Sequence, residues 1–368
     1  MTAPLQTDVP LSALTTLGVG GPARGLGFAS DHPALLDCLE RADADDAPLL
    51  VLGGGSNLLV ADGGFDGHVL RLTDTAITVV ASEPARVRVR VGAGRDWDDF
   101  VAWTVERDLG GIECLSGIPG RVGAAPMQNI GAYGQEVAEV IASVYAVDRQ
   151  DGSVRRFPPA ACGFGYRTSH FKHVEPDRWI VTNVEFDLTR DAAPTLRYGD
   201  LRRRAEALDG APTLGAVRDL VLAVRREKAM VLDPLDANAR SAGSFFTNPI
   251  LSEDEAETVA ARAGADAMPR WQTASGVKLA AAWLIEQAGF PRGYGDGPAG
   301  LSERHTLAIV NRGGARARDI ADLAATIRRG VRDAFGVTLV PEPVFVGWLG
   351  ASTDDSTAVL DAIDAGDL

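Results

Sequence analysis

The segment from Leu50 to Leu72 restricts the possible folds of this chain more than any other, because its glycine loop lies between two apolar runs and no helix follows. In a Rossmann unit, such glycines open a helix whose N-terminus holds a pyrophosphate. Here residues 58–60 continue as a strand and residues 62–64 form a turn. The pattern therefore excludes a Rossmann site. It predicts a glycine hairpin at residues 53–57, which is either purely structural or binds an anion through its amides.

Length and composition exclude several classes of protein. A chain of 368 residues with 46% hydrophobic residues predicts about two or three domains. It contains neither an apolar run long enough for a membrane span nor a signal peptide pattern, so we expect a cytoplasmic protein. The net charge of −14 argues against nucleic-acid binding. The spacing of Cys38, Cys114 and Cys162 predicts reduced, partly buried thiols and neither a disulfide framework nor a zinc site.

Hydrophobic periodicity predicts alternating groups of strands and helices. Strands are expected at Ala85–Val91, on both sides of an Asp151–Gly152 turn and at 179–188, which together indicate an antiparallel sheet. Helices are expected at Ser30–Ala42, from Asp96 to Gly110, at Leu214–Arg226, from Ser252 to Gly264, at Ala280–Ala288 and at Arg318–Phe335. Residues 351–368 contain several aspartates but no Lys or Arg, which predicts an acidic, mobile tail.

Candidate reactive residues occur in constrained segments that are far apart in the sequence. Arg167 follows a glycine-rich run, Ser244 precedes two phenylalanines, and Glu342 lies between two prolines that hold it in extended chain. Taken singly, these residues could also be a surface ion pair, a turn or cap residue, and a loop charge. No G-x-S-x-G elbow surrounds Ser244, and the histidines lack metal-ligand spacing, so acyl hydrolysis and metal chemistry are not expected.

Eight motifs in register give the chain a resemblance to a known family. From about Leu14 to Val346 they read LGGGSN, SGIPGRVGAAPMQNIGAYG, GYRTSHFK, YGDL, GSFFTNP, KLAAAWLIEQAG, SERHTLAIVN and PEPVF. In this order they resemble the UDP-N-acetylenolpyruvoylglucosamine reductases. The resemblance implies an α+β fold, with a two-part FAD-binding region of the vanillyl-alcohol-oxidase (PCMH) type and a C-terminal α/β substrate domain. The implied domains are 1–80, 81–228 joined by 337–350, and 229–336, followed by the tail 351–368.

The resemblance also implies the cofactors and the residues that bind them. FAD would be bound without a covalent link, since GGGSN contains no histidine that could attach it, and NADPH would supply hydride. The implied FAD-binding residues are Gly53, Gly54, Gly55, Ser56, Asn57, Ser116, Gly117, Ile118, Gly120, Gly123, Gln128 and Gly131.

The implied reaction reduces the enolpyruvyl group of UDP-N-acetylglucosamine enolpyruvate to give UDP-N-acetylmuramate for peptidoglycan. Arg167 and Glu342 would act on the substrate carboxylate, and Ser244 would donate the proton. YGDL resembles the subclass in which a tyrosine loop closes over the substrate. The implied substrate-binding residues are Tyr198, Lys228, Asn248 and His305. Arg225 and Arg226 are further candidates for the diphosphate, or simply part of a solvated helix end.

Two other functions remain compatible with the sequence. One is a flavin oxidase of the same fold that acts on an alcohol or a carbohydrate. The other is a non-enzymatic nucleotide-binding protein in which the glycine loop only holds a ligand. Nothing in the sequence indicates an obligate protein partner.

Overall fold

The structure is a computed structural model that describes residues 5–264, 268–349 and 354–368. By their contacts these residues form two compact units. Unit 1 contains residues 5–7, Gly25–Gly54 and Gly67–Val231, whereas unit 2 contains Asp8–Arg24, Gly55–Asp66 and the described residues from Leu232 to Leu368. The chain thus leaves unit 1 for unit 2 between Gly54 and Gly55, inside the first glycine loop. The division into three domains and a tail that the resemblance implies stays a prediction.

One sheet contains strands that precede and strands that follow helix α1 (His32–Ala44) in the chain. Its order is β1 (Gln6–Pro10), β2 (Pro22–Ala29), β5 (Phe65–Leu72) and β3 (Leu49–Val51). Leu35 and Leu39 of α1 pack against Leu49 and Leu70 of β3 and β5. The predicted helix is confirmed, but it begins after Ser30 because the side chain of Asp31 accepts the cap hydrogen bond from Ala34.

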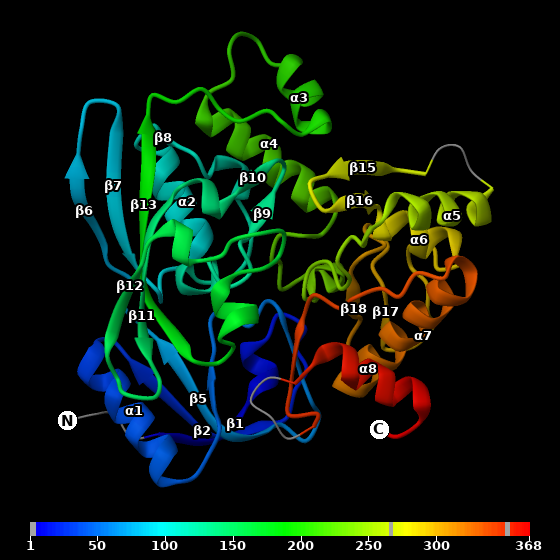
Figure 1. The fold of residues 1–368 in the computed structure, drawn as a ribbon, viewed down its shortest axis with the longest axis horizontal. Coiled ribbons are helices and arrows are strands. Elements are labelled where there is room, and N and C mark those ends of the chain that lie inside the picture. The colour runs from blue at the N-terminus through cyan, green and yellow to red at the C-terminus, as the bar shows by residue number, and fades with distance from the viewer. Residues whose placement is uncertain (1–4, 265–267, 350–353) are drawn as a thin grey trace. The chain divides into compact units, whose positions relative to one another are not determined.

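Unit 1 also contains a larger antiparallel sheet (Figure 1). Its order is β12 (Val154–Phe157), β11 (Ile141–Asp148), β13 (Trp179–Arg190), β7 (Arg86–Gly92) and β6 (Ile77–Ser82), with β8 (Leu109–Gly110) paired to β13. The predicted alternation is confirmed, since Val87, Val89 and Val91 are all buried. The rings of Phe100, on α2 (Trp97–Val105), and Phe186, on β13, are 4.9 Å apart.

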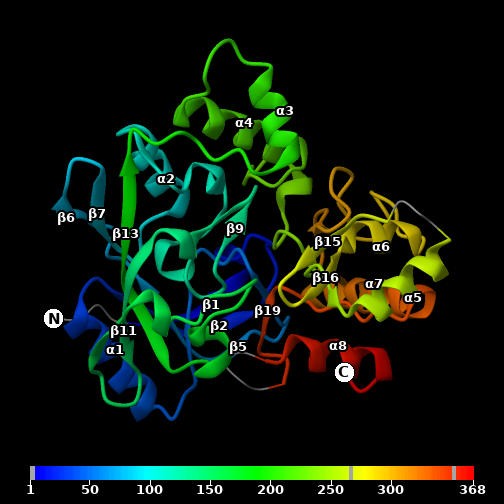
Figure 2. The same cartoon turned by 45° about the horizontal axis from the view of Figure 1, so that its top comes forward.

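Two helices and several short elements complete unit 1. Figure 2 shows α3 (Gly199–Glu206) beside α4 (Leu214–Glu227). The short elements are β9 (Gly131–Ala132), β10 (Gln135–Glu136), the 3₁₀ helices Glu113–Leu115, Val122–Ala124, Val137–Glu139 and Pro159–Ala161, and the π-helix His170–Val174. Helix α2 was expected to reach Gly110, but it ends at Val105, and Asp108 then adopts a left-handed conformation with φ 53°.

Unit 2 surrounds a separate core that includes Phe245, Phe345 and Ile320. Its strands are β4 (Leu58–Val60) paired in parallel with β19 (Val344–Val346), then β14 (Ile250–Leu251), β16 (Gly276–Leu279) and β15 (Arg270–Thr273) in that order, and β17 (Ala299–Leu301) paired with β18 (Ile309–Asn311). Its helices are α5 (Glu253–Ala263), α6 (Ala281–Gln287), α7 (Ala317–Phe335) and α8 (Ser356–Ala365), besides the 3₁₀ turns Leu11–Leu14 and Ala237–Ala239.

The predicted glycine hairpin is wrong. Strand β3, before the loop, pairs in parallel with β5, whereas β4, after it, pairs in parallel with β19. Both strands are apolar and bury residues such as Leu50 and Leu59, so each finds a partner in its own core instead of pairing with the other. The absence of a helix directly after the loop, which excluded a Rossmann site, is confirmed within residues 52–60.

The prediction of a mobile acidic tail is also wrong for residues 356–365. They form α8, which begins at the cap residue Asp355 and ends at Gly366. Val359 and Leu360 are fully buried, while Asp361 and Asp364 pair with Arg328 and Arg329 of α7. Asp361 and Asp364 therefore face cations, and Val359 and Leu360 give the helix a buried side. Residues 351–353 of this segment lie outside the described residues.

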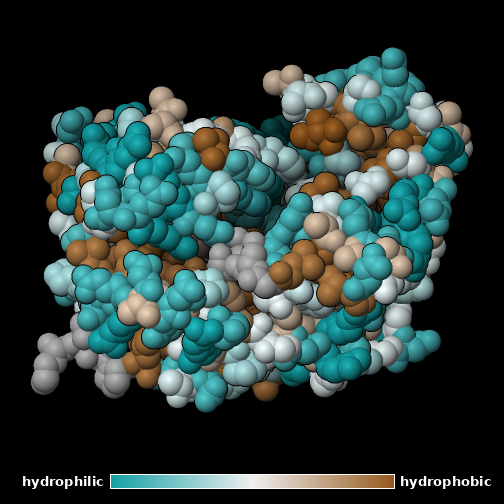
Figure 3. Space-filling model, turned by 60° about the horizontal axis from the view of Figure 1, so that its bottom comes forward, coloured by the Kyte–Doolittle hydropathy of each residue, from teal (hydrophilic) through white to brown (hydrophobic). Residues whose placement is uncertain are grey.

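The thiols of the chain are free and buried, at Cys38, Cys114 and Cys162. Burial raises the pKa of Cys114 and of Cys162 to about 12. None of the helices in residues 5–264, 268–349 and 354–368 is long and apolar enough to span a membrane. On the face seen in Figure 3, hydrophobic residues occur as separate groups among hydrophilic ones.

Candidate functional site

Two glycine loops, at residues 53–57 and 116–134, meet backbone to backbone in unit 1 through Gly54 and Gly120. A Cβ atom placed on Gly54 would lie 2.7 Å from the Cα of Gly120, and one on Gly123 would lie 2.6 Å from the Cβ of Ala93. Such distances leave no room for a side chain. Gly54 is therefore brought against Gly120, and Gly53 lies against Ala124 and Arg121 of the same loop, whereas Gly123 packs against Ala93. The expected role of these glycines in FAD binding stays a prediction.

Asp98 fixes the second glycine loop. Its Oδ1 accepts a 2.6 Å hydrogen bond from the amide of Gly117, and both carboxylate oxygens bind Arg218 at 2.6 and 2.9 Å. Burial tends to raise the pKa of Asp98, but the bonds from Arg218 and Gly117 lower it, and the net shift is downward. The sequence pattern predicted a helix start at Asp96, which is the N-cap residue, but did not single out Asp98. The signal was an acidic pair, Asp98 and Asp99, in the first turn of the helix.

Arg225 is buried beside this loop. Only 8% of its surface is exposed, and its Nη2 donates to the carbonyl of Met230 at 2.7 Å. Its Nε has no hydrogen-bond partner among the residues that the structure describes, and lies 3.3 Å from where a Cβ of Gly117 would be. Burial lowers the pKa of Arg225, while Tyr133 and Asp98 counteract this shift. The interpretation as a solvated helix end is therefore wrong for Arg225, which is buried. Arg226, in contrast, is exposed, and Lys228 is the C-cap residue of α4.

Arg167 lies beside Gly131 in a left-handed conformation. Its φ is 55°, and its Nη2 donates to the carbonyl oxygen of Gly131 at 3.0 Å. Asn129 and Tyr133, on either side of Gly131, are left-handed as well, with φ of 46° and 49°. Non-glycine residues reach this conformation at a cost of about 1–3 kcal/mol each, and such residues cluster at functional sites. No local sequence pattern predicted these left-handed conformations.

The remaining predicted residues of unit 1 lie near these loops. Tyr198 precedes α3, is 43% exposed, and packs edge-on against Tyr133 with 5.4 Å between ring centroids. The hydroxyl of Ser116 donates to the carbonyl of Glu113 at 2.6 Å. Ile118 packs against the core of unit 1, and Gln128 is half-buried in the same loop.

In unit 2 the segments that carry Ser244 and Glu342 are paired. The amide of Glu342 donates to the carbonyl of Phe245 at 2.8 Å, and the amide of Thr247 donates to that of Val340 at 3.0 Å. Phe245, the residue that follows Ser244, is fully buried and anchors this segment in the core. Ser244 and Glu342, which are far apart in sequence, are thereby brought to neighbouring positions on adjacent extended segments.

Asn57 connects the first glycine loop to the same segment. Its side-chain Nδ2 donates to the carbonyl of Glu342 at 3.1 Å, and its own carbonyl accepts from the amide of Val344 at 2.9 Å. Gly55, two residues earlier, has φ 64°, and a Cβ there would lie 1.9 Å from the carbonyl oxygen of Leu14. Gly55, Ser56 and Asn57 thus belong to unit 2, and their expected role in FAD binding stays a prediction.

Two other predicted residues make local contacts in unit 2. The side-chain oxygen of Asn248 accepts a 3.0 Å hydrogen bond from the amide of Ala281, at the start of α6. The backbone carbonyl of His305 accepts from the amide of Ala308 at 3.0 Å. Both side chains are attached to short, well-anchored segments. Their proposed contacts with substrate stay predictions.

The predicted catalytic residues divide between the units: Arg167 belongs to unit 1, and Ser244 and Glu342 belong to unit 2.

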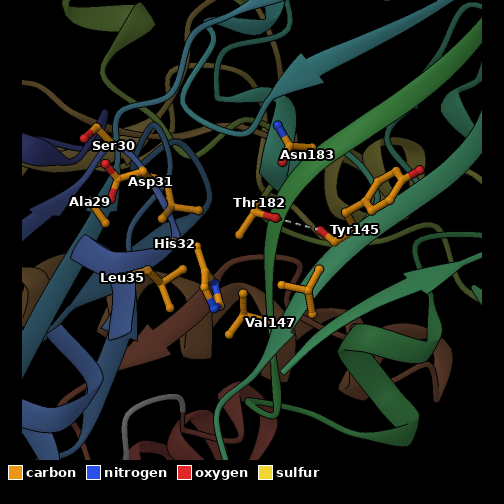
Figure 4. A pocket seen from close by; sticks show the side chains of 11 residues that line it. Ala29, Ser30, Asp31, His32, Leu35, Tyr145, Val147, Thr182 and Asn183 are labelled. Atoms are coloured by element: carbon orange, nitrogen blue, oxygen red, sulfur yellow. Dashed lines mark hydrogen bonds between the residues drawn. The ribbon is translucent and has the colours of Figure 1, made fainter. Parts of the chain in front are cut away.

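A separate cavity of about 170 Å³ lies in unit 1 between α1 and the larger sheet (Figure 4). His32 and Thr182 line it, and the Thr182 hydroxyl donates to the carbonyl of Tyr145 at 3.3 Å. The described lining of this cavity includes none of the predicted site residues.

Comparison with known proteins places this geometry in a family. Residues 24–158 match an FAD binding domain, and residues 233–346 match the C-terminal domain of UDP-N-acetylenolpyruvoylglucosamine reductase. The UDP-N-acetylenolpyruvoylglucosamine reductase of Thermobifida fusca is 48% identical over 355 residues, which cover 94% of this chain and 99% of that protein. The chain belongs to the UDP-N-acetylenolpyruvoylglucosamine reductase family. The resemblance drawn from the motifs is confirmed at the level of the family.

Further relatives agree with this assignment to the UDP-N-acetylenolpyruvoylglucosamine reductases. The reductase of Cutibacterium acnes is 48% identical over 346 residues, covering 92% of this chain and 90% of its own length. The crystal structure of the reductase from Thermus caldophilus matches with a TM-score of 0.64 and 28% identity, over 93% of this chain and 98% of that one. The predicted fold class, an FAD-binding region followed by the family's C-terminal domain, is confirmed.

Proposed function

We propose that this protein is a cytoplasmic, FAD-containing reductase of the tyrosine-loop subclass, which uses NADPH to reduce the enolpyruvyl group of UDP-N-acetylglucosamine enolpyruvate. The product is UDP-N-acetylmuramate, a precursor of peptidoglycan. Membership of the family supports the reaction. The observation that carries the assignment of roles is the pairing of the Ser244 and Glu342 segments through the Glu342 amide and the Phe245 carbonyl.

The glycine loops fit a bound FAD. The close approach of Gly54 to Gly120 supports this, because it leaves backbone rather than side chains to face a ligand. The buried guanidinium of Arg225, with its Nε lacking a partner in the described chain, supports a polar ligand group beside Gly117. The residues proposed to hold FAD without a covalent link are Gly53, Gly54, Gly55, Ser56, Asn57, Ser116, Gly117, Ile118, Gly120, Gly123, Gln128 and Gly131. When bound, FAD would carry hydride from NADPH to the enolpyruvyl group.

Glu342 and Arg167 are proposed to stabilise the charge that develops on the substrate. Addition of hydride to the terminal carbon places negative charge on the neighbouring carbon, from which it spreads into the attached carboxylate. A guanidinium and a protonated carboxyl group directed at this carboxylate would lower the barrier. Glu342 would act in its protonated form, as a hydrogen-bond donor.

Ser244 is proposed to donate the proton that completes the reaction. Its hydroxyl would protonate the carbon next to the carboxylate, a step in which positioned proton transfer contributes about 10²- to 10⁴-fold. The anchoring of Phe245 supports this role, because a general acid must be held at a fixed distance from the carbon.

Tyr198, Lys228, Asn248 and His305 are proposed to contact the substrate. Because the chain carries a net charge of −14, local basic residues are needed to attract a diphosphate. Lys228 and the exposed Arg226, at the end of α4, supply such charge. The exposed ring of Tyr198 is held against Tyr133 and is available to a ligand that covers the loop.

One spectroscopic experiment tests this proposal against both alternatives. The purified protein should be yellow, lose its colour on anaerobic addition of NADPH, and regain it when the enolpyruvyl substrate is added. A protein that stays colourless after addition of FAD would instead be a nucleotide-binding protein. Rapid recolouring by oxygen and an alcohol or carbohydrate, with no response to the enolpyruvyl compound, would indicate an oxidase.

A further inference from the structure

The segment that contains Glu342 is hydrogen-bonded along both edges. On one edge, Asn57 binds the carbonyl of Glu342 and the amide of Val344. On the other, the carbonyl and amide of Phe345 contact the start of the C-terminal segment. Successive peptide groups of an extended chain point to opposite edges, so both edges must be occupied if the segment is to be fixed.

Ser356 occupies the second edge with its side chain. Its hydroxyl donates to the carbonyl of Pro343 at 2.8 Å and accepts from the amide of Phe345 at 3.2 Å. Two residues earlier, the amide of Asp354 donates to the carbonyl of Phe345 at 2.8 Å. The hydroxyl therefore acts as a neighbouring strand would, beside the residue that directly follows Glu342.

Helix α8 holds Ser356 in place. Val359 and Leu360 are fully buried against the core of unit 2, and Figures 1 and 2 show α8 beside α7. Arg328 of α7 is only 2% exposed and donates both to Asp361 of α8, at 2.6 Å, and to the carbonyl of Leu339, at 3.1 Å. The same guanidinium thus connects α8 to the chain three residues before Glu342.

We propose that α8 is a positioning element for Glu342, and that Ser356 is the positioning residue through which it acts. The inference rests on the proposed function, in which Glu342 acts when the enolpyruvyl substrate is reduced. The matched family domain ends at residue 346, before this helix begins. The C-terminal segment therefore adds a contact to the candidate site from outside the matched domain.

Glu342 needs such positioning because catalysis tolerates only small displacements of the reacting groups. A displacement of about 1 Å in a reacting arrangement can reduce the rate by about 100-fold. Pro341 and Pro343 have no backbone N–H, so this segment has fewer hydrogen bonds of its own with which to resist displacement. Loss of the Ser356 hydroxyl would leave the Pro343 carbonyl and the Phe345 amide without this partner and loosen the chain next to Glu342.

The test separates the two half-reactions of the FAD-loaded Ser356→Ala variant. Reduction by NADPH should be unchanged, whereas recolouring by the enolpyruvyl substrate should slow by about tenfold, since only the second step uses Glu342. Amide hydrogen exchange in the same loaded protein should become faster at Phe345. Ser356→Thr, which keeps a hydroxyl, should restore the wild-type values. Thr357→Ala, one residue further along the same helix turn, should change neither measurement.

Equal slowing of both half-reactions, loss of FAD, or an unchanged rate of recolouring in Ser356→Ala would overturn this inference. Glu342→Gln distinguishes it from the proposed function. If Glu342→Gln slows recolouring but Ser356→Ala does not, only the inference about α8 fails. If Glu342→Gln leaves recolouring unchanged, the role of Glu342 in the proposed function fails.

Discussion

The part of unit 1 and the part of unit 2 that carry predicted site residues are built in different ways. In unit 1, Gly54 has no room for a side chain beside Gly120, the buried Arg225 lies beside Gly117, and left-handed residues lie around Gly131. In unit 2, Ser244 and Glu342 lie on ordinary extended segments that are joined by backbone hydrogen bonds. The first part suits a ligand that is held against backbone, and the second suits side chains that must be aimed at a reacting atom.

This difference predicts different failures on mutation. Changes at the closely packed glycines of unit 1 should affect binding of FAD, because they alter the shape of the backbone. Changes at Ser244 or Glu342 should leave binding of FAD intact and affect the chemistry on the substrate.

The largest expected effect is that of Ser244→Ala. Removal of the proposed general acid should lower turnover by about 10²- to 10⁴-fold, measured by NADPH consumption with saturating substrate. The FAD content and the midpoint of thermal unfolding should stay at wild-type values, because the hydroxyl is not part of the core. Thr247→Val, three residues further along the same segment, is the matched control and should remain active.

Gly54→Ala should affect FAD binding instead. The new Cβ would lie 2.7 Å from the Cα of Gly120, and overpacking of this kind costs about 1–3 kcal/mol, so the Kd for FAD should rise by up to about 100-fold. Titration of the FAD-free protein measures this change. Gly63→Ala provides the control, since a Cβ there meets nothing within 4 Å. Normal FAD affinity in Gly54→Ala would mean that the packed glycines do not shape the FAD site.

The smallest effect is expected from Asp98→Asn, at acid pH. The folded protein holds the pKa of Asp98 below its ordinary value of 3.8, so its stabilising contribution is present above that value and lost as pH falls through the lowered pKa. The side chain of Asp98 is 33% exposed, so solvent weakens its ion pair. We therefore expect Asp98→Asn to lower the free energy of unfolding by about 1–2 kcal/mol at pH 7. In urea unfolding the gap between variant and wild type should narrow below about pH 4. A constant gap down to pH 3 would show that the charge of Asp98 is unimportant.

The sequence predicted most of the elements of the fold and the antiparallel pairing across the Asp151–Gly152 turn, but not the partners of β3 and β4. Alternation at Val87, Val89 and Val91 and the helix start at Ser252 depend on neighbouring residues, so they could be recognised locally. The partners of β3 and β4 lie in different sheets, which local pattern does not reveal. The C-terminal helix was missed because its many aspartates suggested solvent, whereas Arg328 and Arg329 lie opposite Asp361 and Asp364.

The same limit applies to the candidate site. The glycines and the proline-flanked Glu342 could be recognised from the sequence as candidate site residues, because the backbone conformations that they indicate depend on neighbouring residues only. The bond from Asn57 to the carbonyl of Glu342 joins positions that are far apart in the chain, and the same is true of the bond from Gly117 to Asp98. The burial of Arg225 beside Gly117 also depends on packing, and its sequence pattern equally fitted an exposed helix end.

The most direct test of the role of Ser244 is rapid mixing of Ser244→Ala, first with NADPH and then, once reduced, with the enolpyruvyl substrate. If Ser244 donates the proton to the substrate, the flavin loses its colour at the wild-type rate in the first step and regains it far more slowly in the second. Equal slowing of both steps would contradict the assignment of Ser244 to the substrate half of the reaction.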